Sequence, residues 1–383
     1  MSTAEQFDII VIGSSPILVL YALHHQAMGK RVCLMEKNAT LGGAWKIKVC
    51  PKISDEYLLE TSCHLAEWYD GGYELLESLS NETFPPALTP QPVKVFETKR
   101  TRPYTTRLET LKGLVAWSYR MPVGLLRLII SFVSRDTANT RKRLQNLKLD
   151  FGRLHTEITK RAFQLHKYPR VREPAGGFAA WMKRQIDRLA NSSVRVLHEE
   201  VFEVQRMAPF HWEILTRSGK KFEASLLVMG QSACIEKWNG AGEKKPVFSQ
   251  YFHVVISVRS NDVLIRNRYI HCVENKFVHR LSYLFDSVQD DGMSRSFWLV
   301  QCRVSEISID ELNKHLKKIT QNYRFFKLSA VAQIVLTING EYVQSSDDAA
   351  FQVVTESDCL VLRTIGDLTR NILFANEVQK AFA

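Results

Sequence analysis

The chain of 383 residues carries a formal net charge of +11 at pH 7, and 45% of its residues are hydrophobic. This length allows about two domains, and the composition agrees with a soluble, globular protein that fills a large core and contains no repeat or low-complexity tract. Its seven cysteines are scattered without a metal-ligand spacing, which excludes a zinc ribbon and is typical of reduced thiols in a cytosol.

The chain opens with a predicted strand, helix and strand that together form a βαβ unit. An apolar run comes first, then a small-residue turn, an apolar helix that begins at a proline and ends at a glycine, and a second strand. In order, these elements are Phe7–Ile12, Gly13-Ser14-Ser15, Pro16 with a helix over 17–28, Gly29, and a strand over 31–35. Because the first strand begins at Phe7, we expect no signal peptide.

The turn of this unit is suited to an anion. A helix N-terminus offers N–H groups and a partial positive charge that stabilise a pyrophosphate. Glu36 lies 23 residues after Gly13, close to the spacing at which a carboxylate reaches a ribose hydroxyl. The usual motif has glycines at 13, 15 and 18, whereas this chain has Ser15 and Leu18, so we expect the helix to pack on its strand more loosely or in a shifted position. An ordinary crossover with a serine-capped helix is the alternative interpretation of this motif.

The middle of the chain combines a markedly apolar segment with many basic residues. Gly113–Val133 is the most apolar stretch, and its charge-free part is too short to span a bilayer. Because basic residues follow over 135–172, one prediction is contact between 113–133 and a membrane surface. A buried helix pair broken at Pro122 is the alternative. No nucleic-acid motif accompanies the basic residues, so we expect no nucleic-acid partner.

The rest of the chain alternates mainly between predicted strands and turns. A hairpin is expected around Ser218-Gly219, and Gly230 closes a buried strand. The residues after it are not glycine-rich, so no second dinucleotide motif is present. Cys359 is expected to be a buried thiol in a strand. The predicted strands are Val194–Val204, Trp212–Thr216, Phe222–Met229, Phe252–Val258, Phe297–Val304 and Val331–Thr337, and the predicted helix is Ile309–Asn322.

Four further motifs occur in a characteristic order. Leu41-Gly42-Gly43-Ala44-Trp45 follows Glu36-Lys37, and Leu58–His64 comes next. A Gly-Gly helix start lies at 176–177, and Gly366-Asp367 precedes an apparent helix. Together with the βαβ unit, this order resembles the FAD-binding flavoproteins of the glutathione-reductase-type superfamily. Within them it is similar to the branch of amine oxidases, phytoene desaturases and protoporphyrinogen oxidase, as a divergent member.

The resemblance implies an α/β fold class, in which a Rossmann-like FAD-binding domain is interleaved with an α+β substrate domain. The FAD-binding domain would comprise 1–50, 174–240 and 355–383. The substrate domain would comprise 51–173 and 241–354.

The resemblance also implies FAD as the cofactor and a set of residues that bind it, with no metal. The pyrophosphate would lie against Gly13, Ser14 and Ser15, and the adenosine ribose would be bound by Glu36, followed by Lys37. The flavin-side phosphates would pass Gly43, Ala44 and Trp45, and the adenine would be held by Val201 and Phe202. A ribityl hydroxyl would be bound by Gly366 and Asp367, and the isoalloxazine would face the helix N-terminus at Asn371 and Ile372. Ala44 stands where relatives often have an arginine, so one charged phosphate contact is missing.

The implied function is that of a cytoplasmic or peripheral-membrane oxidoreductase. It would take hydride from a C–N or C–C bond of a small, lipophilic or biosynthetic-intermediate substrate. His64 is the catalytic candidate, with a structural histidine as the alternative. Many relatives have an aromatic residue before the terminal Gly-Asp; Ile365 stands there instead, which argues against a simple amine oxidase. Two other interpretations stay open: a non-catalytic carrier of lipid or protein partners, similar to GDP dissociation inhibitors, and a flavoprotein subunit active only in a complex.

Overall fold

The computed structural model describes the chain in separate segments, which include the whole predicted βαβ unit and most of 174–343. The described residues are 4–43, 48–50, 54–59, 66–67, 72–85, 93–95, 101–103, 171–172, 174–230, 233–239, 248–266, 270–289, 291–343 and 358–362.

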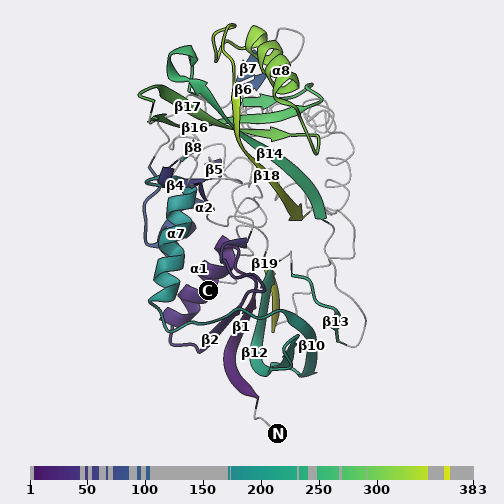
Figure 1. The fold of residues 1–383 in the computed structure, drawn as a ribbon. Helices are drawn as coiled ribbons and strands as arrows, with labels where there is room; N and C mark the ends of the chain where they lie inside the picture. The colour runs from purple at the N-terminus through teal and green to yellow at the C-terminus, as the bar shows by residue number, and fades with distance from the viewer. Residues whose placement is uncertain are drawn as a thin grey trace, which may run out of the picture.

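A sheet with a parallel centre organises the unit drawn in the lower half of Figure 1. Strand β1 (Glu5–Ile12) lies at its centre and pairs in parallel with β2 on one side and β12 on the other. The strand order is β13-β10-β11-β12-β1-β2-β9, and β19 also pairs in parallel with β12. The other strands are β2 (Val32–Met35), β9 (Arg195–Leu197), β10 (Val201–Ala208), β11 (His211–Thr216), β12 (Lys221–Gly230), β13 (Lys237–Trp238) and β19 (Cys359–Leu362).

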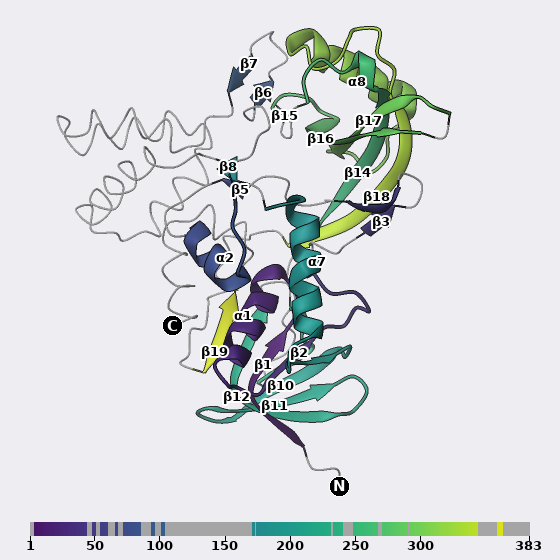
Figure 2. The same ribbon diagram turned by 90° about the vertical axis from the view of Figure 1, so that its left-hand side faces the viewer.

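Alternate residues of the central strands enter two different cores, because successive side chains of a strand point to opposite faces. Ile9 and Val11 pack with helices α1 (Pro16–Ala27), α2 (Gly72–Ser80) and α7 (Gly177–Ala190). Ile10 and Ile12 pack on the opposite face with side chains of the β10–β11 hairpin. Burial on both faces explains the continuous apolar run in β1. Figure 2 shows α1, α2 and α7 gathered on one side of this sheet.

The second sheet is mainly antiparallel and forms the unit at the top of Figure 1. Its strand order is β18-β14-β17-β16-β15-β6-β7, and α8 (Ile309–Asn322) covers one face through Leu312, Leu316 and Ile319. The Ser308 hydroxyl caps α8 by accepting from the N–H of Glu311. The strands are β6 (Val93–Val95), β7 (Thr101–Pro103), β14 (Phe248–Arg259), β15 (Ile270–Cys272), β16 (Val278–Val288), β17 (Ser294–Cys302) and β18 (Gln333–Val343).

Short elements complete the described part of the chain. A 3₁₀ turn, η2 (Ser260–Asp262), follows β14. Two small sheets pair β3 with β4 and β5 with β8. Their strands are β3 (Lys48–Cys50), β4 (Ser54–Leu59), β5 (Ala66–Glu67) and β8 (Val171–Arg172).

The predicted fold class is confirmed: a Rossmann-like parallel sheet is combined with a mixed α+β unit. The helix over 309–322 and the hairpin around Ser218-Gly219 are also confirmed, and Cys359 is a buried strand residue. The single strand expected over 194–204 is wrong, because the chain forms β9 and then β10, which pair with different neighbours. The domain boundaries stay a prediction.

Candidate functional site: the turn after the first strand

The site is centred on Gly13-Ser14-Ser15, at the carboxyl end of β1 and the N-terminus of α1. From β1 the sheet continues through β2 and β9 on one side and through β12 on the other. The direction of the chain path therefore reverses at β1. In open α/β sheets, ligands bind outside the carboxyl ends of the strands at such a switch point. The turn lies where the fold places a nucleotide site.

Two glycine segments meet at this turn. Gly13 has φ +103° and Gly42 has φ +110°, conformations that favour glycine. Gly43, at φ +56°, lies so close to the turn that a Cβ there would be 3.2 Å from the Ser15 Cα. A side chain at 43 would thus press on the backbone of the turn. The two glycine segments are thus in close contact beside the N-terminus of α1, whose dipole favours an anion.

Leu18 stands where the usual motif has a glycine, and its side chain is buried against the turn; looser or shifted packing of the helix stays a prediction. The Leu18 side chain is only 1% exposed. Its Cδ1 would lie 3.2 Å from a Cβ built on Gly13, so the glycine at 13 provides space that Leu18 occupies. A missing glycine in the helix is therefore accommodated by the glycine in the turn.

Glu36 extends from the end of β2 toward the turn, and its side chain is held at both oxygens. Its Oε2 accepts from the Ser14 hydroxyl at 2.7 Å. Its Oε1 accepts from the backbone N–H and the side-chain amide of Asn38, at 2.9 and 2.6 Å. A carboxylate has about four lone-pair positions, so these three donors leave one acceptor position. Glu36 is 6% exposed, and it retains the capacity to accept from one ligand hydroxyl.

The edge of the site near β10 is bordered by cationic side chains. Val201 is buried at the start of β10. The ring of Phe202 lies 5.5 Å from the Arg217 guanidinium carbon and 5.0 Å from the Lys237 ammonium. These contacts hold the Phe202 ring by cation–π attraction. Binding of an adenine by the β10 backbone at Val201 and Phe202 stays a prediction.

The described part of the chain contains only some of the predicted cofactor-binding and catalytic residues. The structure brings Gly13, Ser14, Ser15, Glu36 and Gly43 together, and Lys37 is exposed beside them. The predicted residues that lie outside the described part of the chain are Ala44, Trp45, His64, Gly113–Val133, Gly366, Asp367, Asn371 and Ile372.

Two contributors were missed by sequence reasoning. Asn38 binds Glu36 through two donors, and the His198 ring Nδ1 lies 2.8 Å from the Asn38 carbonyl oxygen. An asparagine two residues after a strand-end acid favours a local turn, and that signal identifies Asn38. His198 follows β9, far from Asn38 in sequence, and no local signal identifies it.

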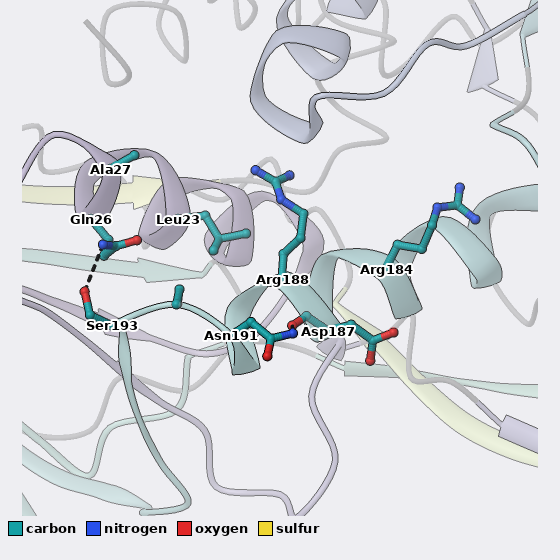
Figure 3. Close-up of a pocket in the computed structure, with 9 residues that line it drawn as sticks. Leu23, Gln26, Ala27, Arg184, Asp187, Arg188, Asn191 and Ser193 are labelled. Atoms are coloured by element: carbon teal, nitrogen blue, oxygen red, sulfur yellow. Dashed lines mark hydrogen bonds between the residues drawn. The ribbon is translucent and has the colours of Figure 1, made fainter.

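A separate hollow of about 660 Å³ lies between the carboxyl ends of α1 and α7, lined in part by Leu23 and Asn191. Figure 3 shows Gln26 bonded to Ser193 at its edge. Arg188 turns from it to the backbone oxygens of residues 79 and 80 in α2. The hollow is at the opposite end of α1 from the turn, so it is distinct from the nucleotide site.

The residues at the turn fit a dinucleotide cofactor. Gly43 places no side chain beside the turn, and the N-terminus of α1 supplies a dipole that favours a phosphate. The remaining acceptor position of Glu36 suits a ribose hydroxyl. Gly13, Ser15, Glu36 and Gly43 are the described residues that would hold such a group.

The fold is shared with solved structures that include two oxidoreductases. Putrescine oxidase bound to putrescine has a TM-score of 0.56 at 11% identity, over 98% of this chain and 100% of that chain. A protein from Pyrococcus furiosus gives 0.57 at 12%, over 97% of both chains. An oxidoreductase from Methanosarcina mazei gives 0.56 at 10%, over 96% of this chain and 99% of that chain. At such low identities these likenesses show the fold.

Comparison with protein-family models gives no match. Comparison with curated protein sequences also gives none. Within the described segments, no helix is long and apolar enough to cross a membrane, and no three metal-ligating side chains are grouped to hold an ion.

Proposed function

We propose that this protein is an FAD-dependent oxidoreductase that takes hydride from a C–N or C–C bond of a small, lipophilic or biosynthetic-intermediate substrate. The observation that carries the proposal is the meeting of Gly13–Ser15, Glu36 and Gly43 at the switch point of a parallel sheet. A chain with no dinucleotide to bind has no evident need for a buried acid and a two-glycine segment packed on the turn at this position.

The chain's own part in the reaction is binding and orientation. FAD, when bound, supplies the hydride acceptor, and the protein fixes its position relative to the substrate. Glu36 accepts from the adenosine ribose, and the turn after β1 binds the pyrophosphate at the dipole of α1. Asp367 is proposed to bind a ribityl hydroxyl, and His64 is the catalytic candidate, with a structural histidine as the alternative, each on the basis of the sequence motif.

Similarity of fold to putrescine oxidase supports a C–N bond as the site of oxidation. The Ile365 that replaces the aromatic residue found in many amine oxidases instead favours a substrate that is not a simple amine. We therefore place both C–N and C–C substrates within the proposal. Contact of 113–133 with a membrane surface is proposed as the route by which a lipophilic substrate arrives.

The experiment is anaerobic mixing of the FAD-loaded protein with panels of amines and of lipophilic intermediates. Loss of the oxidised-flavin absorbance with one compound, followed by its return when oxygen or a quinone is admitted, supports the proposal. A protein that retains FAD but is reduced by no compound, and that copurifies with a partner, supports the interpretation as a subunit of a complex. Failure to take up FAD supports the carrier interpretation and contradicts the proposal.

A further inference from the structure

Ser14 occupies the middle position of the glycine turn and connects three separate parts of the site. Its hydroxyl donates to Glu36 Oε2 at 2.7 Å and accepts from the Gly42 N–H at 3.1 Å. The Gly42 N–H also lies 3.1 Å from the Ser14 carbonyl oxygen. One side chain therefore joins the turn after β1, the acid after β2 and the two-glycine segment.

The connection is buried, which increases its effect on geometry. Ser14 is 1% exposed and Glu36 is 6% exposed, so water does not readily replace either partner. A hydrogen bond to a carboxylate is stronger than one between neutral groups, and a bond protected from water gains further. Asn38 restrains the other carboxylate oxygen. Ser14 and Asn38 together leave Glu36 little freedom to rotate.

We propose that Ser14 is a positioning residue for FAD, which fixes the Glu36 carboxylate for the adenosine ribose before the cofactor binds. Preorganisation of this kind increases affinity because fewer groups are ordered during binding. A residue with no side-chain hydroxyl at this position would remove the bond from the turn to Glu36, whereas the Gly42 N–H would keep the backbone oxygen of residue 14 as an acceptor. This inference rests on the proposed FAD function. It assigns a role to the residue between positions 13 and 15, where the usual motif has glycines.

The test is the substitution Ser14→Ala, measured by titration of the FAD-free protein with FAD and, separately, with FMN. We expect the Kd for FAD to rise roughly tenfold, because a bond to a charged group and its ordering effect are lost. The Kd for FMN should change much less, because FMN lacks the adenosine ribose. The variant should still fold, since the Gly42 N–H keeps the Ser14 carbonyl oxygen as an acceptor.

The matched control is Ser80→Ala, which also removes a buried hydroxyl that donates a hydrogen bond, here to the Leu76 carbonyl oxygen in α2. It should leave both Kd values unchanged, which separates positioning from a general loss of stability. In a Glu36→Ala background, Ser14→Ala should weaken FAD binding by less than twofold, because residues that act through one another are not additive.

The outcomes distinguish this inference from the proposed function. Wild-type protein without saturable FAD binding overturns both. Wild-type protein that binds FAD, with a Ser14→Ala variant that binds FAD as tightly, overturns the positioning role alone. An equal loss for FAD and FMN, or full additivity with Glu36→Ala, also overturns it.

Discussion

Replacement of Gly43 by alanine tests the close approach between the two glycine segments. Gly43 has φ +56°, where an L-residue costs roughly 1–2 kcal/mol. The added Cβ would lie 3.2 Å from the Ser15 Cα and 3.4 Å from the Ser15 nitrogen. Both are backbone atoms, so the segments must separate or the turn must distort. We expect at least a tenfold rise in the Kd for FAD, which corresponds to about 1.4 kcal/mol.

Gly29→Ala is the matched control for this change. Gly29 has φ +84°, and a Cβ there meets no atom within 4 Å. It follows α1 at the end opposite to the turn. Both variants pay a backbone cost and should show a lowered thermal midpoint, whereas only Gly43→Ala should lose FAD affinity in a fluorescence titration. Equal FAD affinities for the two variants would refute the role assigned to Gly43.

Three other predictions concern stability and reactivity. Asp358 is fully buried, and its Oδ2 accepts from Arg206 at 2.9 Å and from the Phe210 N–H at 2.6 Å. Arg206→Ala removes the cationic partner of this buried carboxylate, so the free energy of unfolding in urea should fall by about 3–5 kcal/mol. A fall below ~1 kcal/mol would contradict this account. Burial raises the pKa of Cys33, Cys272 and Cys302 to about 12. Peptide mapping after alkylation of the folded protein at pH 8 should therefore find these thiols unmodified. Rapid labelling of the three thiols would contradict their burial. Burial, and then the nearby His271, Arg303 and Arg280, lower the pKa of His279 from 6.5 to about 4. The stabilising effect of neutral His279 is thus present above pH 6.5 and is lost as the pH falls toward 4. Between these two pH values, the thermal midpoint of His279→Gln should fall less steeply than that of the wild-type protein. Parallel plots of thermal midpoint against pH for the two proteins would contradict this role of His279.

The elements predicted well from the sequence are those whose pattern is local. The βαβ unit has a continuous apolar strand, a proline at the start of its helix and a glycine at the end. Helix α8 has an apolar stripe at helical spacing and a serine cap, and its predicted bounds match the structure. Short-range signals of this kind determine local structure with little influence from the rest of the chain.

The failures arise where distant contacts decide the structure. The alternation of apolar and polar residues over 194–204 predicted one strand. The chain instead forms two strands there, because β9 pairs with β2 while β10 pairs with β11 and β13. Sequence spacing identified Glu36 but not the hydrogen bond from Ser14 that holds it, since Ser14 reaches Glu36 only after β1 and β2 have paired. The space for Leu18 beside Gly13 is likewise a tertiary feature, which the degenerate motif alone does not reveal.

The most direct test of the account is an absorption spectrum of the purified protein in the near-ultraviolet and visible range, with any released flavin identified after denaturation. The account predicts an oxidised-flavin spectrum at about one FAD per chain, either as isolated or after incubation with FAD. A colourless protein that takes up no added FAD would contradict the central claim that the turn after β1 binds this cofactor.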